Sequence, residues 1–323
     1  MRGAAVAAIV AVLASPALAA WSPRTRVLVL SAYPTEGAQL LAAAAPVTEA
    51  GVFNGRPFFA GTIAGKNVVL GLTGIGIVNA DLTTRAVLAQ LKASGLRVKG
   101  IAFSGVAGST YQIGDVVVPD HWTDDLQHTT QPYPPYRANR HLLAVARRLV
   151  GNVALDPYLS VEDQACTGER VGLATPVRVD DDPQLRVNPG DEGHSTDPYG
   201  GRAVPCFEPG TFLLGCEACG APLVVPGMGG DPTSFLDPSF FEGLFASFAA
   251  GSAGSAVIQD METAGVARVA VEKHIPFIAF RGVSDGRGDP LMLPPVPYLQ
   301  FSVYQQLAAD NAAAVELAFL AAW

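Results

Sequence analysis

The chain has 323 residues, of which 49% are hydrophobic and 15% are charged, and its mean hydropathy is +0.28. A disordered chain has low hydrophobicity and high charge, so this composition excludes that class. The 21 Lys and Arg against 29 Asp and Glu give a net charge of -8, which argues against a nucleic acid polymer as partner. The length fits one large domain or two ordinary ones.

Residues 1–19 have the pattern of a secretory signal peptide. Arg2 precedes an apolar run over residues 4–14, and Ala17-Leu18-Ala19 supplies the small residues of a cleavage site. The run is shorter than the about 20 residues that span a bilayer, and an N-terminal anchor helix is the alternative. We therefore expect a secreted or periplasmic protein with no membrane contact after leader removal.

In chain order, short apolar runs alternate with helical patterns. Strands are expected at residues 26–31, 57–63, 67–72, 98–103 and 116–118, and a helix at 78–91. This alternation predicts an α/β fold with three αβα layers, a central mixed twisted sheet with helices on both faces. Regular structure returns late in the chain, with strands at 257–258 and 276–280 and helices at 262–273 and 303–322.

The segment at about 151–222 is rich in Gly, Pro and Asp and has no lasting period. We expect it to be a cysteine-containing insertion within a single domain over residues 20–323. An even number of cysteines in an exported protein predicts two disulfides of open connectivity. The alternative is a zinc site on the metal-like spacing of Cys216 and Cys219, or a calcium site at the acidic run 180–182. We expect no metal and no cofactor. The four cysteines are Cys166, Cys206, Cys216 and Cys219.

Polar or glycine-rich sequences follow several expected strands. Ligands of α/β sheets gather at the carboxyl ends of strands. A tight turn explains each glycine segment alone equally well, so only their combination points to a ligand site. The segments are residues 31–36, 73–76, 104–108, 259–262 and 280–285.

Together, these segments resemble the nucleoside phosphorylase and nucleosidase superfamily. The closest branch is the methylthioadenosine/S-adenosylhomocysteine nucleosidases, with secreted relatives that include plant bark storage proteins. The most specific part is Asp260-Met-Glu-Thr-Ala-Gly-Val-Ala267, followed by Ile275-Pro-Phe-Ile-Ala-Phe-Arg-Gly-Val-Ser-Asp285. The resemblance covers roughly residues 26–127 and 223–320. It implies a phosphorylase/nucleosidase-like fold, a small-molecule nucleoside as ligand, and a homo-oligomer.

The resemblance also implies cleavage of a purine N-glycosidic bond through an oxocarbenium-like sugar. Asp285 matches the general acid at N7 of the base, for which burial should raise its pKa. Glu36 matches the carboxylate that activates the attacking water, and Glu262 the one that holds the ribose hydroxyls. The alternatives are a helix N-cap for Asp285 and a solvated first-turn acid for Glu36.

Further residues match binding or supporting positions of the family. Met261 would pack against the ribose and Phe235 would stack on the base, although an ordinary core position is the alternative for both. Arg281 and Ser284 would support the acidic loop, with a purely structural role as the alternative for Arg281. The remaining binding candidates are Gly105, Val106, Ala107, Gly108 and Asp260.

The sequence favours water over phosphate as the nucleophile. Phosphorylases bind phosphate with Arg side chains and glycine amides. Here the first strand ends in Tyr33-Pro-Thr-Glu36, where the hexameric phosphorylases have Gly-Asp-Pro-x-Arg. Phe103 and Val106 stand where those enzymes carry an Arg and a Ser. Two departures from the nucleosidases are Val106 in place of a Ser and Asp260 in place of a Glu.

We therefore expect a secreted purine-nucleoside hydrolase that releases the free base and ribose or a 5′-substituted ribose. A phosphate-dependent phosphorylase is one alternative. A non-catalytic nucleoside-binding or storage protein on the same fold is the other.

Overall fold

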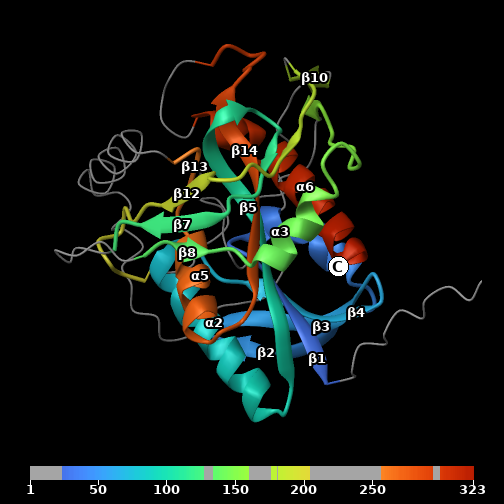
Figure 1. Ribbon diagram of the computed structural model, residues 1–323, viewed down its shortest axis with the longest axis vertical. Coiled ribbons are helices and arrows are strands. Elements are labelled where there is room, and N and C mark those ends of the chain that lie inside the picture. The colour runs from blue at the N-terminus through green and yellow to red at the C-terminus, as the bar shows by residue number, and fades with distance from the viewer. Residues whose placement is uncertain (1–23, 127–133, 160–175, 180, 204–255, 294–298) are drawn as a thin grey trace, which may run out of the picture.

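The computed structural model describes residues 24–126, 134–159, 176–179, 181–203, 256–293 and 299–323. One mixed sheet of twelve strands organises these residues around the long strand β5 (Arg97–Gln112) (Figure 1). β5 pairs in parallel with β1 (Thr25–Ser31) and β14 (Phe277–Arg287), and antiparallel with β13 (Ile258–Asp260). β5 therefore connects the two halves of the sheet.

The sheet extends in both directions from β5. On one side it continues from β1 to β4 (Lys66–Leu72), β3 (Arg56–Ile63) and β2 (Thr48–Phe53). On the other it continues from β13 to β12 (Glu192–Ser195), β7 (His121–Asp124) and β8 (Tyr136–Arg137). The short strand β6 (Val116–Val117) joins β14 to β11 (Leu185–Arg186), while β9 (Tyr158–Leu159) and β10 (Val177–Arg178) form a separate pair.

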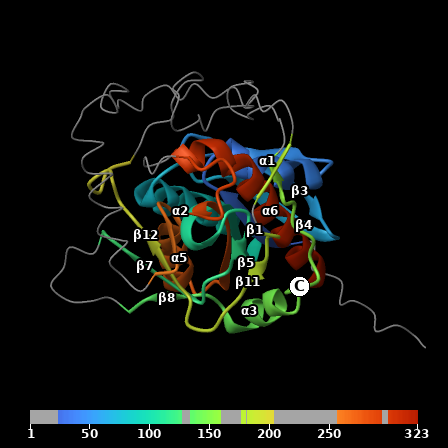
Figure 2. The ribbon, with the colours of Figure 1, turned by 90° about the horizontal axis from the view of Figure 1, so that it is seen from above.

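Helices cover both faces of the sheet, as the sequence predicts. Helices α2 (Ile77–Ala93) and α5 (Thr263–Glu272) lie together on one side (Figure 2). Helices α1 (Pro34–Ala43), α3 (Arg140–Arg147) and α6 (Leu299–Ala322) pack on the other. The alternation of side chains along β1 explains this, because successive residues of a strand point to opposite faces. Leu28 and Leu30 meet α5 in one core, whereas Val27 and Val29 belong to the other.

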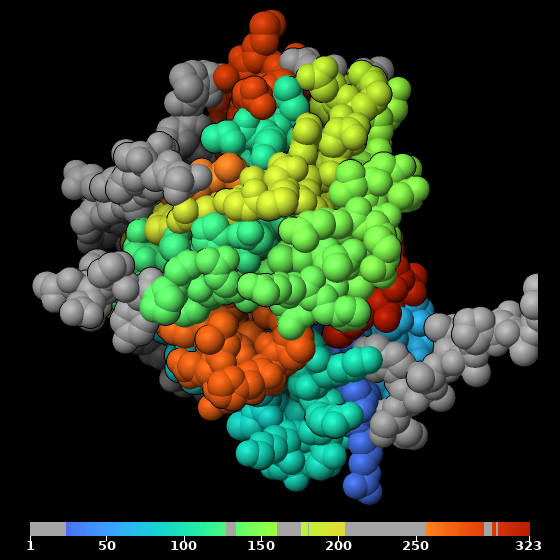
Figure 3. All heavy atoms as spheres, in the orientation of Figure 1, coloured from blue at the N-terminus to red at the C-terminus, as the bar shows by residue number. Residues whose placement is uncertain are grey.

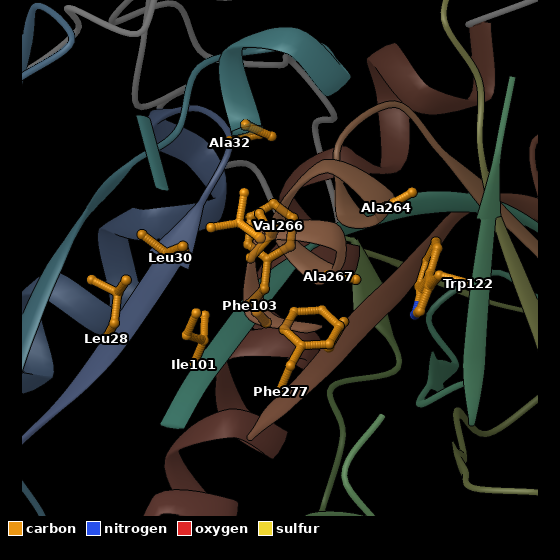
Figure 4. Close-up of a cluster of buried hydrophobic side chains, with 14 of the residues drawn as sticks. Leu28, Leu30, Ala32, Ile101, Phe103, Trp122, Ala264, Val266, Ala267 and Phe277 are labelled. Carbon is orange, nitrogen blue, oxygen red and sulfur yellow. The ribbon is translucent and has the colours of Figure 1, made fainter. Parts of the chain in front are cut away.

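The core beneath α5 is aromatic and aliphatic. Leu28 and Leu30 from β1 converge with Phe103 from β5 and Val266 from α5 (Figure 4). Gly265 lets α5 approach α2 closely, since a Cβ there would lie 2.4 Å from the carbonyl oxygen of Ile77. This contact brings the start of α5 next to the start of α2. Within the described part of the chain, no helix is both long and apolar enough to cross a bilayer.

Two expectations about regular structure need correction. The strand expected at 98–103 does not end before the glycine segment, because β5 continues to Gln112 and stays paired with β14. The segment 151–222 also contains β11 and β12, and β12 lies in the main sheet between β7 and β13 (Figure 1). The described atoms of this segment are drawn in yellow and yellow-green in Figure 3, where they lie at the surface of the molecule. Gly193 of β12 allows this, since the ring of Trp122 lies within 2.6 Å of the place of its Cβ. All four cysteines lie outside the described residues.

Candidate functional site

Glu36 connects the end of β1 with the middle of β5. It lies in the first turn of α1, which begins at Pro34, and its side chain is buried. One carboxylate oxygen, Oε2, accepts a hydrogen bond from the Ala32 amide at 2.6 Å. The other, Oε1, accepts one from the Val106 amide at 2.8 Å. The carboxylate therefore lies where two backbone amides, one directly after β1 and one within β5, would hold an anion.

Arg281 of β14 lies at the centre of three carboxylates and is fully buried. Its Nη2 is 2.7 Å from Oδ2 of Asp260 and 3.9 Å from Oε2 of Glu262. Its Nη1 is 3.4 Å from Oε1 of Glu36. The guanidinium also lies 4.3 Å from the centroid of the Phe103 ring, a favourable cation–π geometry. We call Glu36, Asp260, Glu262 and Arg281 the Arg281 cluster.

Two glycines make room for this cluster. A Cβ on Gly105 would lie 1.8 Å from Nη1 of Arg281 and 2.4 Å from Oε1 of Glu36. Gly76, with a φ of +94°, precedes α2, and its amide donates to Oε1 of Glu262 at 2.9 Å. Glycine adopts a positive φ without the steric penalty that other residues have. The close approach of Arg281 to Glu36 thus requires glycine at position 105.

Burial governs the protonation of two carboxylates in the cluster. It raises the pKa of Glu36 to about 7, although Arg281 and the amides of Val106 and Ala32 act in the opposite direction. Burial, together with the neighbouring charge of Asp260, raises the pKa of Glu262 to about 8 against the effect of Arg281. Both groups therefore titrate near neutral pH, as groups that exchange protons in catalysis often do.

Asp285 occupies a different environment at the end of β14. It is half-buried, and its Oδ2 accepts a hydrogen bond from the Ser284 hydroxyl at 2.7 Å. Its Oδ1 accepts one from the Phe301 amide at 3.0 Å, in the first turn of α6. Burial raises the pKa of Asp285, and these two hydrogen bonds oppose that effect. A raised pKa is what a carboxylic acid needs if it is to donate a proton near neutrality.

The remaining candidates are placed as follows. Met261 is half-buried against the core that contains α5. The carbonyl of Ala107 lies 3.4 Å from the Ser284 hydroxyl, and the Cβ position of Gly108 is 3.7 Å from Cβ of Asp285. Phe235 lies outside the described residues. The structure thus brings the described candidates from β5, β13 and β14 together, and Phe235 stays a prediction.

Sequence reasoning missed two residues that touch the cluster. The Thr263 hydroxyl donates to Oδ2 of Asp260 and accepts hydrogen bonds from Nε and Nη2 of Arg281, at 2.9 and 2.7 Å. The Ser195 hydroxyl donates to Oδ1 of Asp260. Thr263 directly follows Glu262 in the most specific segment and could have been found there. No pattern in the segment around Ser195 marks it.

The described residues also bear on metal binding. Among them, no group of three or more His, Cys, Asp or Glu side chains is arranged to hold a metal ion. In the acidic run, Asp181 accepts a hydrogen bond from Gln112 at 3.1 Å, and Asp182 pairs with Arg178.

Comparisons with known proteins identify a family and relatives of this chain. The sequence profile of the phosphorylase superfamily matches residues 26–162. The uncharacterized protein Rv2293c of Mycobacterium tuberculosis is 36% identical over 192 residues, which cover 57% of this chain and 73% of that protein. The uncharacterized protein Rv2292c of the same organism is 55% identical over 64 residues, which cover 20% of this chain and 85% of that protein.

Solved structures share the fold at low sequence identity. The 5′-methylthioadenosine/S-adenosylhomocysteine nucleosidase of Neisseria meningitidis, in complex with methylthio-immucillin-A, has a TM-score of 0.54 and 17% identity, over 93% of this chain and 100% of that one. The futalosine hydrolase of Helicobacter pylori has a TM-score of 0.54 and 17% identity, over 92% of this chain and 97% of that one.

Proposed function

Because this chain belongs to the phosphorylase superfamily, we propose that it hydrolyses the N-glycosidic bond of purine nucleosides. The products would be the free base and ribose or a 5′-substituted ribose. The solved structures with this fold include nucleosidases, among them one with a nucleoside analogue bound. The observation that carries the proposal is the position of Glu36, whose carboxylate accepts hydrogen bonds from the amides of Ala32 and Val106 next to Arg281.

The position of Glu36 favours water over phosphate. A phosphate ion would be held by the amides of Ala32 and Val106 and by Arg281, because such donors bind oxyanions strongly. Those groups already face the Glu36 carboxylate, whose negative charge would repel phosphate. A carboxylate with a pKa of about 7 can accept a proton from an attacking water molecule. Water as nucleophile makes the reaction a hydrolysis.

The other two carboxylates have complementary roles in this proposal. Asp285, with its raised pKa, would protonate or hydrogen-bond N7 of the purine, which makes the base a better leaving group. Glu262 would accept hydrogen bonds from the ribose hydroxyls, and its ionised form would favour the positive charge that develops on the sugar. The Gly76 amide fixes Oε1 of Glu262 and leaves Oε2 to face Arg281 at 3.9 Å.

The test is to incubate the purified chain with adenosine, inosine and methylthioadenosine, with and without phosphate, and to measure free base. We expect release in phosphate-free buffer, and a decrease of about 10²-fold to 10⁴-fold for Asp285→Asn. Asp156→Asn is the matched control, because Asp156 is an exposed aspartate that accepts a hydrogen bond from the Tyr158 amide. Release that depends on phosphate would identify a phosphorylase instead.

A non-catalytic nucleoside-binding or storage protein is the second candidate. The observation that favours it is the burial of Glu36, which is only 2% exposed and already has two amide partners. A binding protein would retain nucleoside without turnover. Calorimetry with each nucleoside, followed by chromatography of the recovered ligand, distinguishes the two: intact ligand after saturation supports binding, and free base supports hydrolysis.

Export, disulfide bonding and oligomerisation are separate proposals that concern residues 1–19, the four cysteines and a partner copy. We expect the leader to be cleaved after Ala19, which mass spectrometry of the exported protein would detect. Two disulfides would leave no thiol to alkylate in the denatured, unreduced protein, whereas a retained leader or four free thiols would contradict these proposals. Light scattering of the purified chain would test for the homo-oligomer, and a monomer would contradict it.

A further inference from the structure

Ser195 is the last residue of β12 and is completely buried. Its hydroxyl donates to Oδ1 of Asp260 and accepts a hydrogen bond from the amide of Ala264 at 2.9 Å. The parallel pairing of β12 with β13 places Ser195 directly opposite Asp260 in the sheet. Ser195 thus links the segment 151–222 to the carboxylate of Asp260 in the Arg281 cluster through its hydroxyl group.

Asp260 in turn receives donors on both of its oxygens. The amides of Glu262 and Thr263 lie 3.2 Å from Oδ1, the oxygen that Ser195 also contacts. The Thr263 hydroxyl and Nη2 of Arg281 contact the other oxygen, Oδ2. The carboxylate plane of an aspartate rotates readily, since its terminal torsion has broad minima. Most of these contacts come from residues 260–263 or from Arg281. The Ser195 hydroxyl is the one that comes from elsewhere in the chain, so we expect it to limit rotation of the carboxylate plane.

The plane of Asp260 sets the direction of the guanidinium. Nη2 of Arg281 lies 2.7 Å from both Oδ2 of Asp260 and the Thr263 hydroxyl, and Nε donates to the same hydroxyl at 2.9 Å. Because the guanidinium is planar and rigid, fixing these two nitrogens also fixes the third. The third nitrogen, Nη1, faces Glu36 at 3.4 Å and the carbonyl of Val106 at 3.5 Å.

We propose that Ser195 is a positioning residue, which holds Asp260 in the orientation that turns Arg281 toward Glu36. Its kinetic consequences rest on the proposed hydrolase function, whereas its structural consequence does not. Ser195 would not touch the substrate. Its removal should therefore lower kcat and leave KM nearly unchanged, because a small displacement of catalytic groups slows the chemical step without weakening binding.

The first experiment compares three variants of the full chain. Ser195→Ala removes the hydroxyl, and we expect kcat to fall about tenfold to a hundredfold, with KM within about threefold of the wild type. Ser195→Thr keeps the hydroxyl and should recover most of kcat. Ser109→Ala is the matched control, since the Ser109 hydroxyl donates to the Val257 carbonyl at 2.7 Å and accepts from the Tyr111 amide at 3.0 Å. A fall in Tm for both alanine variants, with kcat unchanged in both, would overturn the proposal.

A second experiment tests the contact itself. Asp260→Glu adds one methylene, which would push the carboxylate into the Ser195 hydroxyl, and Ser195→Gly opens that space. We expect the Asp260→Glu, Ser195→Gly double variant to be more active than Asp260→Glu alone. Losses that simply add in the double variant would show that the two side chains act independently and would contradict the proposal.

Crystal structures of the wild type and Ser195→Ala separate this proposal from the proposed function. If the wild type cleaves no nucleoside, the hydrolase function fails, but the distance from Nη1 of Arg281 to Glu36 still decides the role of Ser195. A longer distance in Ser195→Ala supports the proposal. An unchanged Arg281 would overturn it, whatever the activity.

Discussion

The Arg281 cluster and Glu316 are two ways in which this protein buries carboxyl groups. Glu36 and Glu262 have backbone amides and a guanidinium as neighbours. Glu316, in α6, is equally buried, and neither of its oxygens has a hydrogen-bond partner within the described structure. Burial raises the pKa of Glu316 to about 8, with no other cause. Burial alone therefore shifts the titration of a carboxyl group, and partners determine whether the group can act.

The two regions also differ in how charge is balanced. In the cluster, Arg281 compensates part of the negative charge, and its removal would leave three buried carboxylates without a cation among the described residues. Glu316 avoids an uncompensated charge by remaining protonated up to about pH 8. The first arrangement supplies amide and guanidinium donors to acids that titrate near neutral pH, while the second buries a neutral acid whose ionised form has no such donors among the described residues and would destabilise the fold.

The largest effect should come from Arg281→Met. Removing one partner of a buried ion pair costs roughly 3–5 kcal/mol, because it leaves a buried charge uncompensated. We expect that loss in urea unfolding at pH 8, a smaller loss at pH 5, where Glu36 and Glu262 hold protons, and no nucleosidase activity. Arg268→Met is the matched control, since Arg268 pairs with Asp81 at 3.0 Å but is 26% exposed. Equal losses in the two variants would refute the distinction between buried and exposed pairs.

Glu316→Gln should produce the next largest effect, as a change in pH dependence. The folded protein binds a proton at Glu316 up to about pH 8, whereas an unfolded chain releases it near the ordinary value of 4.5. Wild-type stability should therefore fall as pH rises through this window, by a few kcal/mol at about 1.4 kcal/mol for each pKa unit. The glutamine cannot ionise, so its stability relative to the wild type should increase from pH 5 to pH 9.

Unfolding by urea at several pH values measures this difference. Glu49→Gln is the control, because Glu49 lies exposed on β2. If the wild type and Glu316→Gln show parallel pH curves, Glu316 has a partner or a solvent path that compensates its charge.

The sequence predicted much of the site because its residues are close together along the chain. Asp260 and Glu262 lie in one recognisable segment, Arg281 and Asp285 lie in a second segment shortly after it, and Glu36 follows the first strand. Ser195 could not be predicted, because its role depends on the pairing of β12 with β13, and no local period marks a strand of 4 residues. Glu316 was equally hidden, since an acid inside an amphipathic pattern is indistinguishable from an exposed one. Long-range register and burial were the missing information.

Gly105→Ala should have a smaller effect that separates geometry from charge in the Arg281 cluster. The new methyl group would meet Nη1 of Arg281 at 1.8 Å and Oε1 of Glu36 at 2.4 Å, so both side chains must move. Overpacking of this kind costs roughly 1–3 kcal/mol. Gly108→Ala is the stability control, because its Cβ would be in ordinary contact, 3.7 Å from Cβ of Asp285. Thermal unfolding compares the two, and similar Tm values would show that the cluster tolerates displacement.

The smallest effect should come from a surface ion pair whose distances are as short as those in the cluster. Arg85 contacts Glu272 at 2.6 Å and Asp81 at 2.7 Å, and links α2 to α5, but Arg85 is 35% exposed and Glu272 45%. Solvent screens such a pair, so Glu272→Gln should cost less than about 1 kcal/mol, and still less in about 1 M salt. Urea unfolding at low and high salt measures both values.

The loss for Arg281→Met should change little with salt, because its carboxylates are buried. A Glu272→Gln loss as large as that of Arg281→Met would mean that short distance, not burial, determines the strength of these contacts.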